Sequence, residues 1–333
     1  MNALQRYIMV CLVCTVFRGV FRQKKYRGEE VPGEPLSGSR LQAALRSLPI
    51  PVIGLPWYQR DLLPDALVLG HEVGHLVEED FQLTAVIAKA AEVAAAERRP
   101  AWESWLGEVF ADVYGCLSGG PAFVATLLDI LAGDPKEVST AVRNGPLWGD
   151  YPTDWLRARI NLEVLAWMGF STEAKRLSDS WLGGYPSHAM TAFEGDVPAV
   201  VEALLAGPYP TLQGKSFRLV IDFSREMHEE AAKAVASVQE GSAVGSQEIR
   251  TLFAASRLLY EADPKQFATS APALLDHITD SLQPGTRAGE KLLAEDEKGG
   301  QAAGDRKQGI KLLGSLLEEI GARPRPLVGG ADP

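Results

Sequence analysis

Helix-forming segments that end at glycine or proline follow one another through most of the chain, and this succession constrains the fold more than any other feature. Two short segments instead favour β-strands, Pro49–Pro56 and Phe217–Phe223. Proline cannot donate a hydrogen bond to a β-ladder, so the first segment is at most an edge strand. The sequence therefore predicts a mainly α fold with a small edge strand or sheet. The predicted helices lie at residues 41–48, from 65 to 76 or beyond, 84–99, 102–117, 121–132, 153–168, 172–182, 197–206, 224–238, 246–262, 264–282 and 310–320.

Changes in composition divide the 333 residues into four predicted parts. Residues 1–40 form an N-terminal segment that ends in a linker rich in Gly, Pro and Glu. Residues 41–210 form the main domain, and residues 211–283 form a further helical region. Residues 284–333 have the composition of a flexible tail that contains one short helix.

The charge balance and the cysteine content limit the partners and the compartment. A formal net charge of −10 argues against a nucleic-acid partner, because phosphate binding needs a basic surface. Three cysteines provide no disulfide framework and suit a reducing compartment. We therefore expect a cytoplasmic protein.

An apolar run at residues 8–17 is the one N-terminal segment that bears on membranes. It is shorter than the roughly 18 apolar residues that a membrane-spanning helix needs. No small-residue cleavage site follows it, as a signal peptide would require. We do not expect membrane binding, but the alternative stays open that this run attaches the chain to a membrane or directs its export.

The segment His71-Glu72-Val73-Gly74-His75 carries the strongest chemical signal. Residues four apart share one face of a helix, so His71 and His75 can offer two imidazoles to one metal ion. Glu72 stands beside the first histidine, where it can reach a water at the metal rather than the metal itself. The pattern predicts a zinc site with Glu72 as the general base.

A second pair of residues supplies what the first segment lacks. Glu108 and Asp112 are also four apart, on a predicted helix with several apolar residues. A catalytic zinc ion takes three protein ligands, and Glu108 is the candidate for the third. Asp112 is the candidate acceptor for the ring N–H of a liganding histidine, an interaction that selects its tautomer.

Together, the two segments resemble the gluzincin metallopeptidases. The motif at residues 71–75, followed by Glu108-x-x-Ala111-Asp112-x-x-Gly115, is most similar to the prenyl-protein and heat-shock membrane proteases of that group. The resemblance implies a zincin-like catalytic domain within residues 41–210, which binds Zn²⁺. It gives the metal ligands as His71, His75 and Glu108, the base as Glu72 and the orienting residue as Asp112. We expect this chain to lack the membrane-spanning helices of that family.

A third segment resembles the family less closely. Those proteases carry a His-Pro pair with an Arg six residues after the His, whereas this chain has Tyr151-Pro152 and then Arg157. A phenol or a guanidinium can still donate to a developing oxyanion. Tyr151 and Arg157 are therefore candidate catalytic residues.

The leading functional prediction is zinc-dependent hydrolysis of peptide bonds in a peptide or protein substrate. An extended substrate could pair with the predicted edge strand at residues 52–54. One alternative is a binding or regulatory protein built on a catalytically degenerate zincin fold. Another is a structural zinc protein, in which a fourth ligand such as Cys116 closes the site.

Overall fold

The computed structural model describes residues 63–281, with gaps at residues 142, 145–146, 186–189 and 246–247. The predictions for residues 1–62 and 282–333 lie outside the described residues. These are the N-terminal segment, the helix at 41–48, the strand candidate Pro49–Pro56 and the tail with its helix at 310–320.

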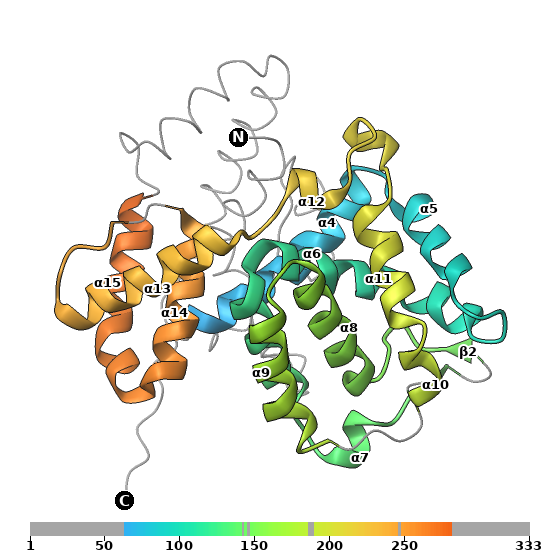
Figure 1. Cartoon of the computed structure of the whole chain (residues 1–333), viewed down its shortest axis with the longest axis horizontal. Helices are drawn as coiled ribbons and strands as arrows, with labels where there is room; N and C mark the ends of the chain where they lie inside the picture. The colour runs from blue at the N-terminus through green and yellow to red at the C-terminus, as the bar shows by residue number, and fades with distance from the viewer. Residues whose placement is uncertain (1–62, 142, 145–146, 186–189, 246–247, 282–333) are drawn as a thin grey trace, which may run out of the picture.

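The described part of the chain is mainly α-helical, as predicted (Figure 1). Its strands, β1 and β2, have two residues each and form one antiparallel pair, in which Arg143 faces Trp148 and Asn144 faces Leu147. In chain order the elements are η2 (Leu63–Val68), α4 (Leu69–Asp80), α5 (Thr84–Ile87), η3 (Ala88–Val93), α6 (Arg99–Leu131), α7 (Pro135–Val138), β1 (Arg143–Asn144), β2 (Leu147–Trp148), α8 (Asp154–Trp167), α9 (Ser171–Leu182), α10 (Thr191–Glu194), α11 (Val197–Ala206), η4 (Pro210–Leu212), α12 (Phe217–Val220), α13 (Arg225–Glu240), α14 (Ile249–Ala262) and α15 (Pro264–Ser281).

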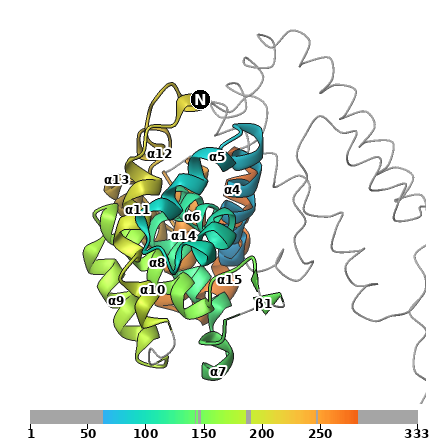
Figure 2. The same cartoon turned by 90° about the vertical axis from the view of Figure 1, so that its right-hand side faces the viewer.

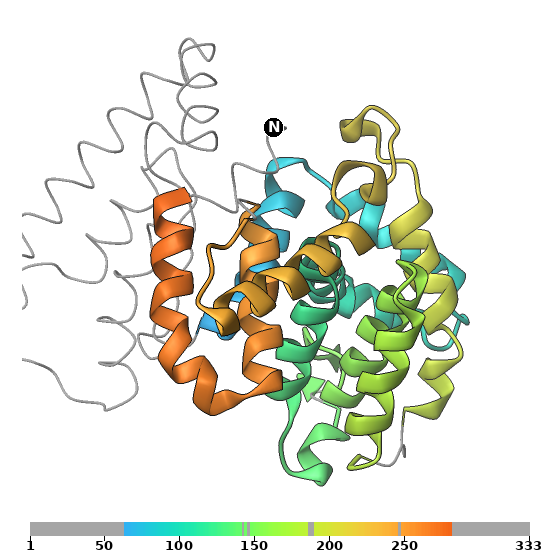
Figure 3. The same cartoon turned by 60° about the vertical axis from the view of Figure 1, so that its left-hand side comes forward.

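The long helix α6 is the centre of the packing. Helices α4, α8 and α14 all pack against it, and α13–α15 gather on one side of the molecule (Figures 1 and 3). Most apolar side chains of α6 are buried, and Trp102, Trp105 and Phe123 are fully buried. By length and composition α6 is apolar enough to cross a membrane, but 89% of its apolar window is buried inside the structure. This burial fits the core helix of a soluble protein.

A kink interrupts α6 at Gly120. The sequence predicts a break between two helices at Ser118–Pro121, and the structure confirms it, because Gly120 has the non-helical backbone angles φ 55° and ψ −139° and separates two helical halves of α6. Residues with a side chain rarely adopt this region of backbone space. A Cβ atom at Gly120 would also lie 2.5 Å from Cδ1 of Phe223. Glycine is therefore required here both for the turn of the backbone and for the approach of Phe223.

The prediction of a strand at Phe217–Phe223 is wrong. Residues Phe217–Val220 form the short helix α12. Phe217 and Phe223 are each buried to 1% exposure, while Leu219 is 76% exposed. The first ring packs edge-on against Phe110, and the second lies against the kink of α6. Packing against α6 thus overrides the β propensity of this segment.

Two predicted helix boundaries are also wrong. Residues 84–99 do not form one α-helix that Pro100 ends, because α5 continues directly as the 3-10 helix η3, which ends at Val93, and Pro100 lies in the first turn of α6. A proline is well tolerated there, since the N–H it lacks would have no partner in the helix. The helix predicted from residue 65 is α-helical only from Leu69, because Asp65 lies within the 3-10 helix η2, which runs directly into α4.

Small residues let α4 and α6, which lie next to each other in Figure 2, approach closely. A Cβ atom on Gly74 would lie 2.7 Å from Cα of Ala111, and one on Gly70 would lie 3.1 Å from Cα of Gly115. Neither contact could be relieved by a side-chain rotation, because the neighbouring atoms belong to the backbone. The two glycines therefore set the distance between the two helices.

We predict that Gly74→Ala destabilises the protein although alanine is the better helix former. The added methyl group must push α4 away from α6, and such overpacking costs about 1–3 kcal/mol. Gly107→Ala on α6 is the matched control, because its Cβ would meet only Oε2 of Glu78 at 3.6 Å. We expect the control to gain about 0.5–1 kcal/mol from helix propensity alone. Urea unfolding of both variants measures the difference, and equal shifts would contradict a close crossing at Gly74.

Candidate metal centre

The two histidines of α4 lie on the side of the helix that faces α6. His71 is buried, whereas the side chain of His75 is 34% exposed. Their rings meet edge to face, with centroids 4.8 Å apart and an interplanar angle of 89°. Because the residues are four apart on one helix, both imidazoles point to the same place.

Glu108 of α6 completes a triangle of ligand atoms. The Nε2 atoms of His71 and His75 lie 3.2 Å apart, and Oε2 of Glu108 lies 3.1 Å from the first and 3.2 Å from the second. Oε2 is buried and forms no hydrogen bond of good angular geometry. Three atoms with lone pairs thus converge on one point, and these three residues could hold a metal ion.

The charges within this triangle are strongly coupled. Burial alone would lower the pKa of His71, but its interactions with Asp112 and Glu108 outweigh burial and raise this pKa to about 9. Burial would raise the pKa of Glu108, but the two histidines outweigh it and lower this pKa to about 2. Glu108 is therefore an anion at neutral pH. A cation bound among the three ligand atoms would replace the proton that the raised pKa keeps on His71.

Asp112 holds the other nitrogen of His71. Its Oδ1 atom lies 2.7 Å from Nδ1 of the ring. Burial would raise the pKa of Asp112, but Arg157 and the hydrogen bond with His71 hold it well below its usual range. The carboxylate accepts the Nδ1 proton, so Nε2 is the ring nitrogen that faces Glu108 and that can bind a metal ion when its proton leaves.

Arg157 of α8 is engaged with the same carboxylate. It donates from Nη2 to Oδ1 at 2.9 Å and from Nε to Oδ2 at 3.0 Å, and its side chain is only 13% exposed. The sequence predicts Arg157 as a donor to an oxyanion. This position instead favours support of His71 through Asp112.

Tyr151 precedes α8, whose first turn is capped by the Thr153 side chain, which accepts from the N–H of Leu156. The tyrosine is 42% exposed, and the guanidinium of Arg157 lies 5.1 Å from the centre of its ring. Burial and the nearby charge of Glu108 raise the pKa of Tyr151 to about 12. The phenol therefore keeps its proton at neutral pH and can donate a hydrogen bond beside the candidate metal centre.

Glu72 lies at the open side of the candidate metal centre. It is exposed to solvent, one residue after His71. Its carboxylate is close enough to Tyr151 to contribute to the raised pKa of the phenol. Glu72 and Tyr151 therefore border the side at which His75 is also exposed.

Sequence reasoning missed Asn161 of α8. Its Nδ2 atom lies 3.3 Å from Oδ2 of Asp112 and donates to the backbone oxygen of Arg157 at 3.0 Å. The available signal was its spacing, because Asn161 is four residues after Arg157 and so shares its helix face.

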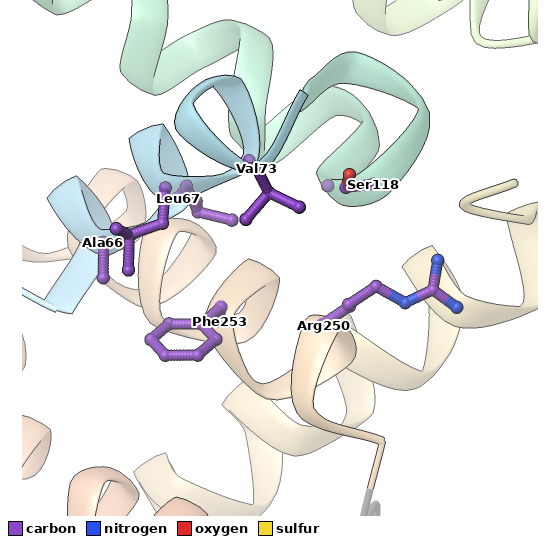
Figure 4. A pocket seen from close by; sticks show the side chains of 9 residues that line it. Ala66, Leu67, Val73, Ser118, Arg250 and Phe253 are labelled. Carbon is purple, nitrogen blue, oxygen red and sulfur yellow. The ribbon is translucent and has the colours of Figure 1, made fainter. Parts of the chain in front are cut away.

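A separate pocket lies between α4, α6 and α14 (Figure 4). Gly70 and Val73 line it from α4, and Arg250 and Phe253 line it from α14. At about 100° per residue, the side chain of Val73 points away from those of His71 and His75. This pocket is therefore not part of the candidate metal centre.

Cys116, considered as a fourth ligand, lies elsewhere. It is fully buried, and its sulfur lies 3.7 Å from the sulfur of Met168. Among the described residues, the candidate metal-binding group consists of His71, His75 and Glu108. This geometry speaks against a site closed by Cys116.

No protein-family model matches this chain, and no curated protein or solved structure is significantly similar to it.

We predict that the wild-type chain binds one zinc ion and that His75→Ala abolishes this binding, because the variant removes one corner of the ligand triangle. His228→Ala is the control, since it removes a partly buried imidazole of α13 whose nearest acidic atom, on Glu173, is 4.0 Å away. Mass spectrometry of the metal after dialysis measures the stoichiometry. Equal loss in both variants would contradict this ligand set.

We predict that Asp112→Asn lowers zinc affinity about 10- to 100-fold, because an amide no longer selects the tautomer of His71. The variant also leaves the buried charge of Arg157 without its partner, which costs about 3–5 kcal/mol of unfolding free energy. Calorimetric zinc titration and urea unfolding measure the two effects. Unchanged zinc affinity in a folded variant would exclude the orienting role.

Proposed function

We propose that this chain is a zinc-dependent hydrolase with a zincin-like catalytic domain, in which His71, His75 and Glu108 bind the metal ion. The ligand triangle carries the proposal. Zinc bonds of about 2.0–2.1 Å at tetrahedral angles separate neighbouring ligand atoms by about 3.3 Å. The three separations in this chain are 3.2, 3.1 and 3.2 Å.

The donor set also supports zinc as the ion. Two imidazoles and one carboxylate are the ligands of one class of catalytic zinc site, which keeps its fourth position open. The buried Asp112 orients His71 from behind. On the other side His75, Glu72 and Tyr151 are exposed to different degrees, which would give a substrate access.

Each residue around the metal site has its own role in the proposed hydrolysis. A bound zinc ion supplies Lewis acidity, which brings the pKa of its water near 7. Glu72 takes the proton of the attacking water and passes it to the leaving group. Tyr151, whose raised pKa keeps it protonated, donates to the oxyanion that develops on the substrate. Asp112 and Arg157 hold His71 in place.

A peptide bond is the proposed target, in a peptide or protein substrate. This choice rests on the resemblance of the motifs at residues 71–75 and 108–115 to those of the gluzincin metallopeptidases. The net charge of −10 is consistent with a substrate other than nucleic acid.

A second candidate is a binding or regulatory protein on a catalytically degenerate zincin fold. Two observations favour it. Tyrosine stands at position 151, where the similar proteases have histidine. The guanidinium of Arg157 is already hydrogen-bonded to Asp112 through two of its nitrogen atoms. This candidate predicts metal binding without turnover.

We predict that the wild type cleaves members of an undirected peptide library and that chelator stops the cleavage. Glu72→Gln should keep its zinc and lose about a hundredfold to ten-thousandfold in rate, because it removes the general base. Glu79→Gln is the control, an exposed glutamate about 10 Å further along the same face of α4. Mass spectrometry measures the products and the bound metal.

The outcomes separate the two candidates. Full activity of Glu72→Gln would refute its role as the base. A wild type that binds zinc but cleaves no peptide would favour the regulatory alternative.

A further inference from the structure

The carboxylate of Asp112 receives four hydrogen bonds. Oδ1 accepts from His71 at 2.7 Å and from Arg157 at 2.9 Å, and Oδ2 accepts from Arg157 at 3.0 Å and from Asn161 at 3.3 Å. A carboxylate has about four lone-pair sites, so all of them are used. Its rotation would break at least one of these bonds.

Asn161 occupies an unusual position for an amide. It is fully buried at 0% exposure, and its Oδ1 atom finds no hydrogen-bond donor among the described residues. Its orientation is nevertheless determined, because Nδ2 faces two acceptors, Oδ2 of Asp112 and the backbone oxygen of Arg157. A flipped amide would direct its oxygen at both acceptors.

We propose that Asn161 is a positioning residue of the metal centre and acts through Asp112 on His71. The inference rests on the metal site of the proposed function but not on peptide cleavage. Arg157 neutralises the carboxylate and binds both of its oxygens. Asn161 adds a fourth bond to Oδ2, the oxygen remote from His71, and so holds Oδ1 against the ring.

Stability alone does not explain this amide. A buried oxygen without a partner reduces the stability of the folded state. A side chain with only a structural role would be replaced with little loss by an apolar residue of similar volume. The positioning role predicts instead that such a replacement weakens the metal site while the fold keeps its stability.

Asn161→Leu separates the two roles. The variant keeps the branched shape of the side chain, with larger methyl groups at its end, and removes both the donor to Asp112 and the unpartnered oxygen. We expect the dissociation constant for zinc to rise about tenfold, at the lower end of the effects seen for residues that support metal ligands. We expect the urea midpoint of the chelator-treated protein to stay the same or to rise.

Thr251→Val is the matched control. Thr251 is fully buried on α14, and its hydroxyl also finds no partner among the described residues. The substitution removes a buried unpartnered oxygen without touching the metal centre. Its zinc dissociation constant should equal that of the wild type.

Calorimetric titration with zinc, on the full chain, gives the deciding result. An unchanged dissociation constant in folded Asn161→Leu would overturn the inference and leave the proposed function standing. Should this variant fail to fold, Asn161→Ala takes its place, with the same tenfold weakening expected and the same unchanged value overturning it. A wild type that binds no zinc would overturn both proposals, whereas a wild type that binds zinc without cleaving peptides would overturn only the hydrolytic one.

Discussion

The close crossing of α4 and α6 is the constraint on which the rest of the candidate metal centre depends. Gly70 and Gly74 bring the backbone of α4 against Ala111 and Gly115 of α6. Each glycine directly precedes a histidine of the motif. The small residues therefore set the separation between the two helices. At this separation the histidines of α4 and the glutamate of α6 can reach one point.

The crossing of two helices does not by itself orient the ligands. Asp112 is buried and charged, and a buried charge is stable only when it is paired and hydrogen-bonded. Helix α8 supplies that pairing through Arg157 and Asn161. Helix α8 is thus coupled to α4 through the carboxylate of Asp112. A change in the packing of α8 would therefore change the orientation of the His71 ring, although α8 provides none of the three candidate ligands.

The two faces of α4 have different surroundings. The histidines meet polar groups of α6 and α8, while Val73 lines a pocket whose other walls are formed by α6 and α14. Helix α14 also packs on α6 and η2. The kink at Gly120 contributes to this arrangement, since it admits the ring of Phe223 just before α13 begins. Helix α14 is therefore in direct contact with the core that carries the candidate metal centre, and α13 and α15 pack on α14.

The sequence by itself determined the local chemistry. The spacing of His71 and His75, and of Glu108 and Asp112, follows from the helical repeat, so their shared faces could be predicted without knowing what they face. The helices α8, α9, α11, α13, α14 and α15 lie close to the predicted ranges, because their caps and apolar periods are local signals. The strand predicted at Phe217–Phe223 failed, since local β propensity did not outweigh burial against α6.

Only the tertiary structure decided what meets across the helices. The partnership of Asp112 with Arg157 and Asn161 joins residues more than forty positions apart, and no local rule relates them. Nor does a local rule relate Tyr151 to Glu108, or Gly74 to Ala111. A helical period states which residues share a face, but the neighbour of that face depends on how whole helices pack, and packing is a property of the entire chain.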